Sequence, residues 1–359
     1  MKKHENHISL LILIGGSLIA ACLFLLPSPP ARADEAGAAL APFDKPIDEA
    51  IGKALAFLAK KQKPDGSFES PLAGDVAVTS LSVMAFLAKG NTPGRGPYGE
   101  VVNKGVDFIL ASQDANGMIV GKGSPGPMYC HCMASLMLSE ISGMVDRARQ
   151  AKIDAVLPKA ISLILSAQQI KKAAEMQGGW RYTPVYPDSD ISCSGWALMA
   201  LRSARNNGSP VPKQAIENAV KFLLNCRMPD GGFAYQPHGG SGPARTGVGL
   251  LGLELCGHHR DAAAVGAGDW VLKNLPKNFG DTFFYYALYY TSQGMFQLGG
   301  NYWDAYALNL YNMMIKFQQP DGSWPQGSGA EGTEGLCYST AMGVLSMSVS
   351  YRQLPIYQR

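Results

Sequence analysis

The sequence predicts an all-α protein, an α6/α6 toroid in which six helix–turn–helix repeats form a closed double ring. Three observations support this prediction. A glycine-containing turn phrase recurs about every fifty residues, the helical segments on its two sides differ in character, and the last helical segment is as apolar as the internal ones. The repeats are expected at residues 47–90, 98–143, 149–207, 212–257, 259–299 and 301–351.

The first residues resemble an export signal and are set apart from the ring. Lys2 and Lys3 precede an apolar run at 8–26, and residues 31–33 offer a small-residue cleavage site. We therefore expect a signal peptide at 1–33, a linker at 34–46, a single toroid domain at 47–351 and a C-terminal tail at 352–359. Two alternatives stay open, because the run is long enough to stay as a membrane anchor and residues 19–22 loosely resemble a lipoprotein cleavage box. The protein is expected to be periplasmic or extracellular, and at a membrane only if the signal segment is retained.

Composition narrows the function classes. Removal of residues 1–33 leaves 28 basic and 27 acidic residues, so the charge is nearly balanced and no basic stripe suggests a nucleic-acid partner. Six cysteines stay in the exported part, but a chain of this length does not need disulfides to fold, and the sequence does not define their pairing.

Each turn phrase has a physical logic. The first copy runs from Gln62 to Phe68 and reads Gln-Lys-Pro-Asp-Gly-Ser-Phe, and residues 318–324 repeat it almost unchanged. Pro-Asp-Gly ends one helix, the glycine supplies a positive φ angle, and the aromatic residue packs back on the helix ends. The glycines of the copies are read as Gly66, Gly117, Gly179, Gly232, Gly280 and Gly322, and the copy at Gly280 is degenerate.

The two helices of a repeat differ in kind. The first is amphipathic, with Ile51, Leu55 and Leu58 opposite lysines, whereas the second, such as 76–87, carries no charge. Uncharged helices at a fixed period are expected to form a buried inner ring inside the amphipathic ones. An open solenoid is the alternative, but it would need polar end helices, and the last helix at 337–351 is apolar. Closure is therefore favoured.

The phrase Gln-x-x-Asp-Gly-Ser-Trp/Phe resembles the repeat of the prenyltransferase and squalene cyclase superfamily. The resemblance covers residues 47–351, and the chain looks like exported bacterial proteins labelled prenyltransferase/squalene oxidase repeat proteins. It implies a toroid fold, but it does not imply one reaction, because the fold also serves complement thioester domains and polysaccharide lyases.

The catalytic motifs of the resembling enzymes are incomplete here. The cyclase Asp-x-Asp-Asp motif falls on residues 190–193, which read Asp-Ile-Ser-Cys, so Cys193 stands where the proton donor belongs. The prenyltransferase zinc motif aligns its aspartate with Asp190 but its cysteine with Ser192. The thioester phrase Cys-Gly-Glu-Gln is absent from the sequence. The resemblance therefore implies neither a known reaction nor a bound metal.

Polar residues cluster where the inner helices begin, so the sequence predicts a ligand site at one rim of the ring. Helix N-termini there are also expected to lower the pKa of cysteines. The candidate catalytic residues are His131, Asp190, Tyr129 and Arg245. The candidate ligand-binding residues are Asp188, Cys193, Trp196, Tyr285, Tyr286, Tyr289 and Tyr338.

Each candidate has a structural alternative. His131, between Cys130 and Cys132, is either a zinc ligand or general base, or a buried histidine satisfied by a neighbour. Consecutive Cys-His-Cys side chains point around a helix, which disfavours zinc, so no cofactor is expected. Asp190 is a catalytic candidate or only a helix cap, and Arg245 receives an anionic ligand or pairs with Asp190. The tyrosines line a cavity or pack between helices.

Two functions follow from these alternatives. The first is a non-catalytic toroid that binds an apolar or aromatic-stacking small molecule or a partner protein. The second is an enzyme acting on a terpenoid or polysaccharide in the central cavity, with His131, Asp190, Tyr129 and Arg245 as its acid–base set. A deep aromatic cavity would favour the enzyme, and a filled ring would favour the binding protein.

Overall fold

The computed structural model describes residues 39–71, 75–121, 123–124 and 126–358. The expected signal peptide at 1–33, with the apolar run at 8–26, lies outside these residues, as do the first residues of the expected linker. In the described part, no helix has the length and apolar character needed to span a bilayer.

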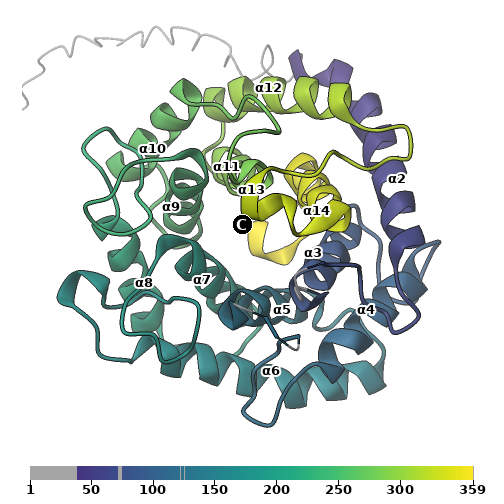
Figure 1. Ribbon diagram of the computed structural model, residues 1–359, viewed down its shortest axis with the longest axis horizontal. Helices are drawn as coiled ribbons and strands as arrows, with labels where there is room; N and C mark the ends of the chain where they lie inside the picture. Colours follow the sequence, from purple (N-terminus) through teal and green to yellow (C-terminus); the bar gives the residue numbers. More distant parts are fainter. Residues whose placement is uncertain (1–38, 72–74, 122, 125, 359) are drawn as a thin grey trace, which may run out of the picture.

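Twelve long helices form two concentric rings in this part of the chain (Figure 1). The outer ring consists of α2 (Asp44–Lys61), α4 (Gly99–Ala111), α6 (Arg147–Gln168), α8 (Lys213–Asn225), α10 (Ala262–Lys273) and α12 (Asn301–Phe317). The inner ring consists of α3 (Asp75–Ala88), α5 (Pro127–Ile141), α7 (Ile191–Asn206), α9 (Pro243–Leu255), α11 (Phe284–Leu298) and α14 (Gly335–Met347). Short elements add η1 (Ala41–Phe43), η2 (Ala174–Met176), α13 (Gly329–Gly332), η3 (Val349–Tyr351) and η4 (Pro355–Tyr357). The predicted all-α toroid is confirmed.

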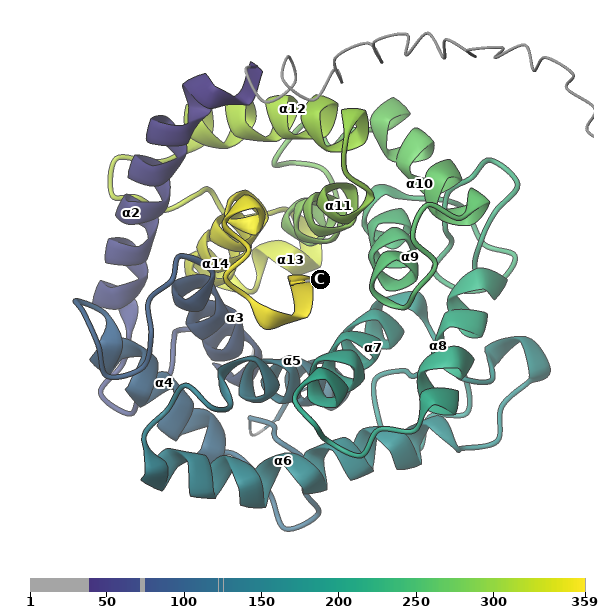
Figure 2. The ribbon, with the colours of Figure 1, turned by 180° about the vertical axis from the view of Figure 1, so that it is seen from behind.

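The outer helices bury one face and the inner helices are buried nearly all round, as predicted. The outer helix α2 buries one face, with Ile51, Leu55 and Leu58, and keeps its lysines at the surface. The inner helix α3 is buried from Val76 to Ala88 except at the partly exposed Ala77. The ring closes because α14 packs against α3, and α12 against α2, as seen from behind in Figure 2.

A repeated glutamine joins four of the six repeats to the next one. The Gln62 side-chain amide donates to the Gly66 carbonyl at 3.0 Å and to the Val101 carbonyl of α4 at 2.8 Å. Gln113 and Gln168 make the same pair of bonds with the outer helices that follow them. Gln318 closes the circle, because its amide donates to the Ala50 carbonyl of the first helix at 2.7 Å.

The turn glycines set the spacing between repeats. Gly66 has φ +92°, and a Cβ atom there would lie 2.2 Å from the Lys104 carbonyl oxygen of the next outer helix, so only glycine fits. In the third and fourth repeats this position belongs to Gly178 and Gly231, one residue before the predicted Gly179 and Gly232. In the first repeat the turn glycine stands two residues before the aromatic residue Phe68. The glycines at the same distance before Trp180 and Phe233 are Gly178 and Gly231.

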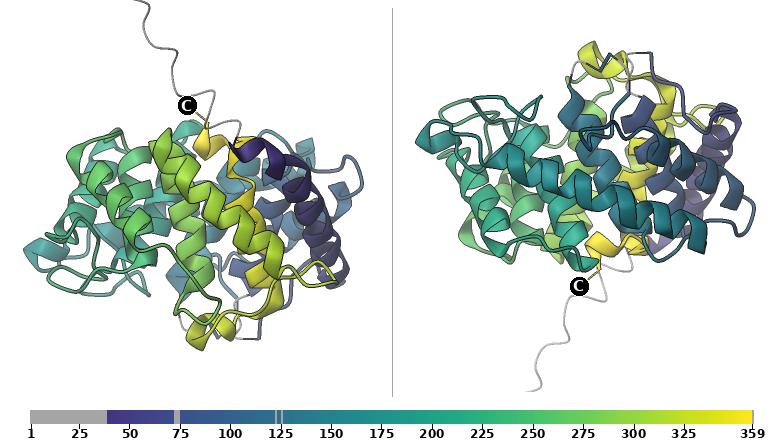
Figure 3. Two further views of the ribbon diagram at one scale, coloured as in Figure 1. Left: turned by 90° about the horizontal axis from the view of Figure 1, so that it is seen from above. Right: turned by 90° about the horizontal axis from the view of Figure 1, so that it is seen from below.

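Two expected boundaries are wrong. Helix α2 begins at Asp44, inside the stretch expected to be a linker at 34–46. The expected tail at 352–359 is not separate from the ring, because Leu354, Ile356 and Tyr357 are buried. Figure 3 shows this C-terminal segment and α13 at opposite faces of the ring. The segment therefore belongs to the toroid and closes one end of its lumen.

Candidate functional site

Arg181 organises a polar cluster at the rim where α5 and α7 begin. It directly follows the turn residue Trp180, and its Nη1 atom lies 2.5 Å from Asp188 Oδ2. Its Nε atom lies 3.9 Å from Asp190 Oδ2. Burial disfavours the charged form of Arg181, but the hydrogen bond to Asp188 and the nearby Tyr235, Asp188 and Asp190 raise its pKa above the ordinary value, so the guanidinium group stays charged.

Asp190 is the N-cap of α7, as one of its predicted roles required. Its Oδ1 atom accepts the Cys193 backbone N–H at 2.9 Å, and its own N–H donates to the Trp180 carbonyl at 2.9 Å. The side chain is fully buried, and burial raises its pKa to about 6 although Arg181 and the backbone donors lower it. Asp190 is therefore a cap with an unusually basic carboxylate.

Tyrosine rings surround the guanidinium group. The Arg181 Cζ atom lies 5.0 Å from the ring centroid of Tyr182, 5.2 Å from that of Tyr186 and 5.7 Å from that of Tyr235. The Tyr182 and Tyr235 hydroxyls form a hydrogen bond with each other. The Tyr129 ring, at the start of α5, lies 6.1 Å from the Tyr182 ring.

Backbone hydrogen bonds hold two of these tyrosines at helix starts. The Tyr182 carbonyl accepts the Met128 N–H of α5 at 3.0 Å, and the Tyr235 carbonyl accepts the Ile191 N–H of α7 at 2.9 Å. The loops are thus fixed at these points while the tyrosine rings are half-buried. We call this set the tyrosine mouth. It consists of Tyr129, Arg181, Tyr182, Tyr186, Asp188, Asp190 and Tyr235.

Three polar atoms of the tyrosine mouth lack hydrogen-bond partners although they are buried. They are Arg181 Nε, Asp188 Oδ1 and Asp190 Oδ2. Hydrogen bonding from the Tyr235 hydroxyl lowers the pKa of Asp190, and the same hydroxyl is hydrogen-bonded to that of Tyr182. Such unpartnered atoms also occur elsewhere in the described residues, for example at Trp196 and Gln293, but here three of them gather around one arginine, and unpaired buried polar atoms are costly.

His131 faces the outer ring, away from the tyrosine mouth. Its Nδ1 atom accepts the Ile119 N–H at 3.0 Å, and its Nε2 atom lies 3.0 Å from the Ala160 carbonyl of α6, which fixes the Nε2–H tautomer. Burial lowers its pKa to about 4, so the ring is neutral. Both nitrogens are therefore engaged, as in the structural alternative.

Other repeats show what His131 replaces. The turn N–H that His131 accepts is accepted by hydroxyl oxygens of Thr79, Ser194, Thr246 and Thr340 in the remaining regular repeats. His131 is thus the second repeat's version of an inner-helix residue that holds the turn. In the described residues, no group of three or more histidine, cysteine, aspartate and glutamate residues has the geometry to hold a metal ion.

The expected lowering of cysteine pKa values at this rim does not occur. Burial raises the pKa values of Cys130, Cys132 and Cys193 above their ordinary range. Desolvation of the thiolate outweighs the field of the helix N-termini, since all three side chains are buried. The six cysteines of the described residues are free thiols.

Arg245 does not pair with Asp190. Its guanidinium group folds back onto Gly242, where a Cβ atom would lie 2.5 Å from Nη2. Among the described residues no ion pair of Arg245 is found, and Arg181 is the cation beside Asp190. Of the four candidate catalytic residues, the structure brings together Tyr129 and Asp190 but places His131 and Arg245 elsewhere.

Aromatic side chains fill the lumen below the tyrosine mouth. The Trp196 ring of α7 stacks on the Tyr289 ring of α11 at 5.2 Å and 16°, and Tyr290 packs edge-on against Trp196 at 5.3 Å. The Tyr286 hydroxyl donates to the Ser192 carbonyl at 3.3 Å, which links α11 to α7 across α9. Trp196, Tyr289 and Tyr290 are almost fully buried. Three predicted ligand-binding residues, Trp196, Tyr286 and Tyr289, thus contribute to the packing of the ring centre.

Glu331 of α13 covers the start of α11. Its carboxylate accepts the Tyr285 N–H at 3.1 Å, the Tyr286 N–H at 2.8 Å and the Tyr338 hydroxyl at 3.2 Å. This anion lies at a positive helix end, which stabilises it, although burial raises its pKa to about 6. The Tyr285 hydroxyl donates to the Pro325 carbonyl, so Tyr285 and Tyr338 serve to seat this segment.

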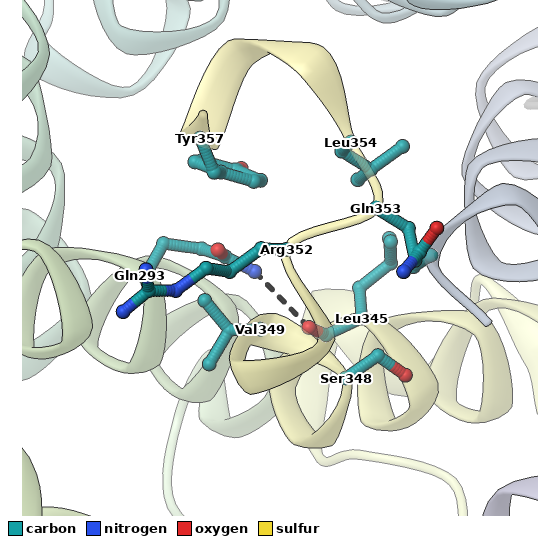
Figure 4. A pocket seen from close by; sticks show the side chains of 9 residues that line it. Gln293, Leu345, Ser348, Val349, Arg352, Gln353, Leu354 and Tyr357 are labelled. Carbon is teal, nitrogen blue, oxygen red and sulfur yellow. Dashed lines mark hydrogen bonds between the residues drawn. The ribbon is translucent and has the colours of Figure 1, made fainter. Parts of the chain in front are cut away.

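The opposite end of the lumen is closed by the C-terminal segment. Ile356 N–H donates to Glu140 Oε2 at 3.0 Å, and Ser203 donates to Glu140 Oε1. The Tyr357 and Tyr289 hydroxyls are hydrogen-bonded at 2.9 Å. Burial raises the pKa of Glu140 to about 7. Figure 4 shows the residues around a cavity of about 10 Å³ at this end, where Gln293 donates to the Leu345 carbonyl.

A larger cavity lies away from the lumen. Its volume is about 160 Å³, and it lies between the first turn and the start of α14. Its lining consists of Lys61, Glu69, Pro71, Gln326, Gly335, Leu336 and Cys337. None of the candidate catalytic residues takes part in it.

Sequence reasoning missed Arg181, Tyr182, Tyr186 and Tyr235. A positional signal for two of them was present, because Tyr182 and Tyr235 each follow the turn aromatic of their repeat, Trp180 or Phe233, by two residues. The equivalent residue after Phe68 is Ser70, so this tyrosine position distinguishes the third and fourth repeats.

Comparisons with known proteins report on the fold. No family model and no curated protein sequence matches the chain. The solved structure of the type II terpene cyclase MstE from Scytonema is similar over 86% of this chain and 100% of that chain, with 16% identity and a TM-score of 0.55. Cellobiose 2-epimerase from Bacillus thermoamylovorans is similar over 84% and 98%, with 12% identity and a TM-score of 0.58.

A glycosidase is similar over 87% of this chain and 98% of that chain, with 13% identity and a TM-score of 0.56. At such identities the likeness concerns the fold alone. The sequence resemblance to the prenyltransferase and squalene cyclase repeats therefore stays at the level of the toroid, and the chain is an α/α toroid similar in fold to terpenoid- and sugar-active enzymes.

Proposed function

We propose that this chain is an exported binding protein whose ligand lies at the tyrosine mouth, and that its lumen is not a reaction chamber. The observation that carries the proposal is the filled lumen, in which Trp196 stacks on Tyr289 and the C-terminal segment closes the far end. An enzyme that works inside such a ring needs an empty cavity for its substrate. Export rests on the sequence of residues 1–33 alone.

The composition of the tyrosine mouth suits binding. Tyrosine and arginine are the residues that most often dominate binding energy, because they combine large apolar area with hydrogen-bonding groups. Here Tyr182, Tyr186 and Tyr235 surround Arg181 and stay half-exposed. The nearby Val185 side chain is 72% exposed and extends the apolar surface. The ligand class that fits is an aromatic-stacking small molecule.

The enzyme alternative has less support. Its acid–base set is divided, since His131 is bonded to Ile119 and Ala160 and Arg245 lies against Gly242. Only Tyr129 and Asp190 lie at the tyrosine mouth, and Asp190 is engaged as a helix cap.

Native mass spectrometry of the protein purified from its own host tests the proposal. We expect a bound small molecule in the natural protein and in a Tyr302→Ala variant, whose altered tyrosine lies on α12 beside Asp269. We expect the molecule to be lost in Tyr186→Ala. Equal retention in both variants, or turnover of squalene by the natural protein, would contradict the proposal.

A further inference from the structure

The three unpartnered atoms of the tyrosine mouth define a hydrogen-bonding pattern. Asp188 Oδ1 and Asp190 Oδ2 are acceptors, and Arg181 Nε is a donor. They belong to one connected group, because Arg181 binds Asp188 through Nη1 and approaches Asp190 through Nε. A complementary ligand must therefore supply two donors and one acceptor within a small space.

We propose that the tyrosine mouth binds an uncharged saccharide through two neighbouring hydroxyl groups. This inference rests on the proposed function and names its ligand class. Each hydroxyl carries one donor and two acceptor lone pairs, so a vicinal diol gives one hydrogen to each aspartate and accepts from Arg181. The flat C–H face of a sugar ring packs against the tyrosine rings.

Charged ligands fit the pattern poorly. A carboxylate or phosphate has acceptors only and would face Asp188 and Asp190, whereas an ammonium group has donors only and would leave Arg181 Nε unpaired. One arginine and two aspartates leave a net local charge of −1, which disfavours an anionic ligand. A primary carboxamide offers two donors and an acceptor, but both donors sit on one nitrogen while the two acceptors belong to different residues.

Access requires a movement of side chains. The three atoms are shielded from solvent, and the hydrogen bond between the Tyr182 and Tyr235 hydroxyls joins two rings that pack against the Arg181 guanidinium. The backbones of both tyrosines are held at helix starts, so rotation of their side chains suffices to part the pair. Binding therefore requires these tyrosine rings to move from the positions that they have in the structure.

Titration calorimetry with the full exported chain tests the inference. The probes are glucose, cellobiose and N-acetylglucosamine, with glucuronate as the charged sugar and sorbitol as a diol without a ring face. We expect saturable binding of at least one neutral sugar, and much weaker binding of glucuronate and sorbitol.

Variants locate the binding. Asp190→Asn keeps an N-cap acceptor but replaces the second oxygen by an amide, and we expect at least a tenfold loss of affinity. Asp188→Asn should behave alike. Asp146→Asn is the matched control, because Asp146 caps α6 with the same Oδ1 geometry. Tyr182→Phe removes the bond that closes the site and should raise affinity about fivefold, as expected for one hydrogen bond.

The outcomes separate the two proposals. If no neutral sugar binds while Tyr186→Ala still abolishes the co-purified ligand, the saccharide inference fails and the proposed function stands. If sugar binds equally well to Asp190→Asn and Asp146→Asn, the inference is also wrong. If ordered water alone occupies the three atoms in a crystal soaked with sugar, the inference is overturned. If Tyr186→Ala keeps the co-purified ligand, the proposed function fails.

Discussion

Each end of the lumen contains a buried carboxylate, and the two carboxylates differ in their hydrogen-bond partners. At the closed end Glu140 accepts hydrogen bonds on both oxygens, from Ser203 and from Ile356. At the tyrosine mouth Asp190 uses Oδ1 as a helix cap, and its Oδ2 lies 3.9 Å from Arg181 Nε and has no partner at hydrogen-bond distance. Burial raises both pKa values, to about 7 and about 6. The comparison shows that the buried carboxylate of the closed end has a hydrogen-bond partner on each oxygen and that of the tyrosine mouth does not, which supports our proposal of a ligand at the tyrosine mouth.

The largest effect is expected when the closed end is removed. Deletion of residues 353–359 exposes Tyr289 and takes away the buried Leu354, Ile356 and Tyr357. Burial of three such side chains contributes about 5 kcal/mol before losses of entropy, so we expect a loss of stability of roughly this size. Denaturant unfolding measures it. Deletion of residues 358–359 is the control, since Gln358 is exposed. Equal stability of the two deletions would show that the closed end is not a structural element.

The packing between neighbouring repeats, which separates the two ends of the lumen, depends on the turn glycines. In Gly66→Ala the new methyl group would meet the Lys104 carbonyl at a positive φ angle, and we expect a loss of about 3 kcal/mol. Gly280→Ala should be nearly neutral, because no atom lies within 4 Å of a Cβ there and its φ angle is not positive. Thermal unfolding of both variants checks this. A similar loss in both would remove the special role of the turn.

Neutralising Glu140 sharpens the comparison at the closed end. The folded-state pKa of about 7 exceeds the ordinary value of 4.5, so its contribution to stability is full below pH 4.5 and is lost as pH rises towards 7. Glu140→Gln keeps an acceptor for Ile356 and avoids the buried charge, and we expect about 2 kcal/mol of added stability at pH 8 with a flatter pH profile. Unfolding at pH 4.5 and pH 8 measures it. An unchanged profile would contradict the assignment.

The smallest effect on stability is expected at the tyrosine mouth. Asp190→Asn keeps the cap to Cys193, and the altered oxygen makes no hydrogen bond, so we expect a change of stability below about 1 kcal/mol at pH 3.8, where the folded natural protein also holds this carboxyl uncharged. Because the folded-state pKa is raised to about 6, the natural protein should lose stability as pH rises from 3.8 through 6, and the variant should not. A large destabilisation would mean that Asp190 serves the fold and not a ligand.

The sequence predicted the architecture well because the fold is repetitive. Charge-free helices such as α3 alternate with amphipathic ones such as α2, and this periodicity survives local irregularity. Single positions were less predictable. The predicted turn glycines of the third and fourth repeats lie one residue after the actual ones, Gly178 and Gly231. Two consecutive glycines in the sequence give no way to decide which one takes the positive φ angle.

The site was harder to predict than the ring. His131 was a catalytic candidate in the sequence, but it accepts the Ile119 N–H of its turn, as Thr79 accepts the Phe68 N–H. Only the structure of the neighbouring backbone shows this role. Arg181 and Tyr186 lie in a loop whose path has no periodic pattern, so nothing in the sequence placed them beside Asp190. The tyrosine mouth forms where the second, third and fourth repeats meet, which is a tertiary property.

The glutamine bridges span very different lengths of chain. Gln62 meets Val101 within 39 residues, but Gln318 meets Ala50 across 268 residues. Early repeats can therefore assemble while the chain is incomplete, whereas the last bond forms only after the sixth repeat exists, and such long-range closure is slow. Until then α3 presents an uncovered apolar edge that α14 later fills. The same face of α3 is then open to a second copy of the chain. Association between chains therefore competes with completion of the ring at this stage.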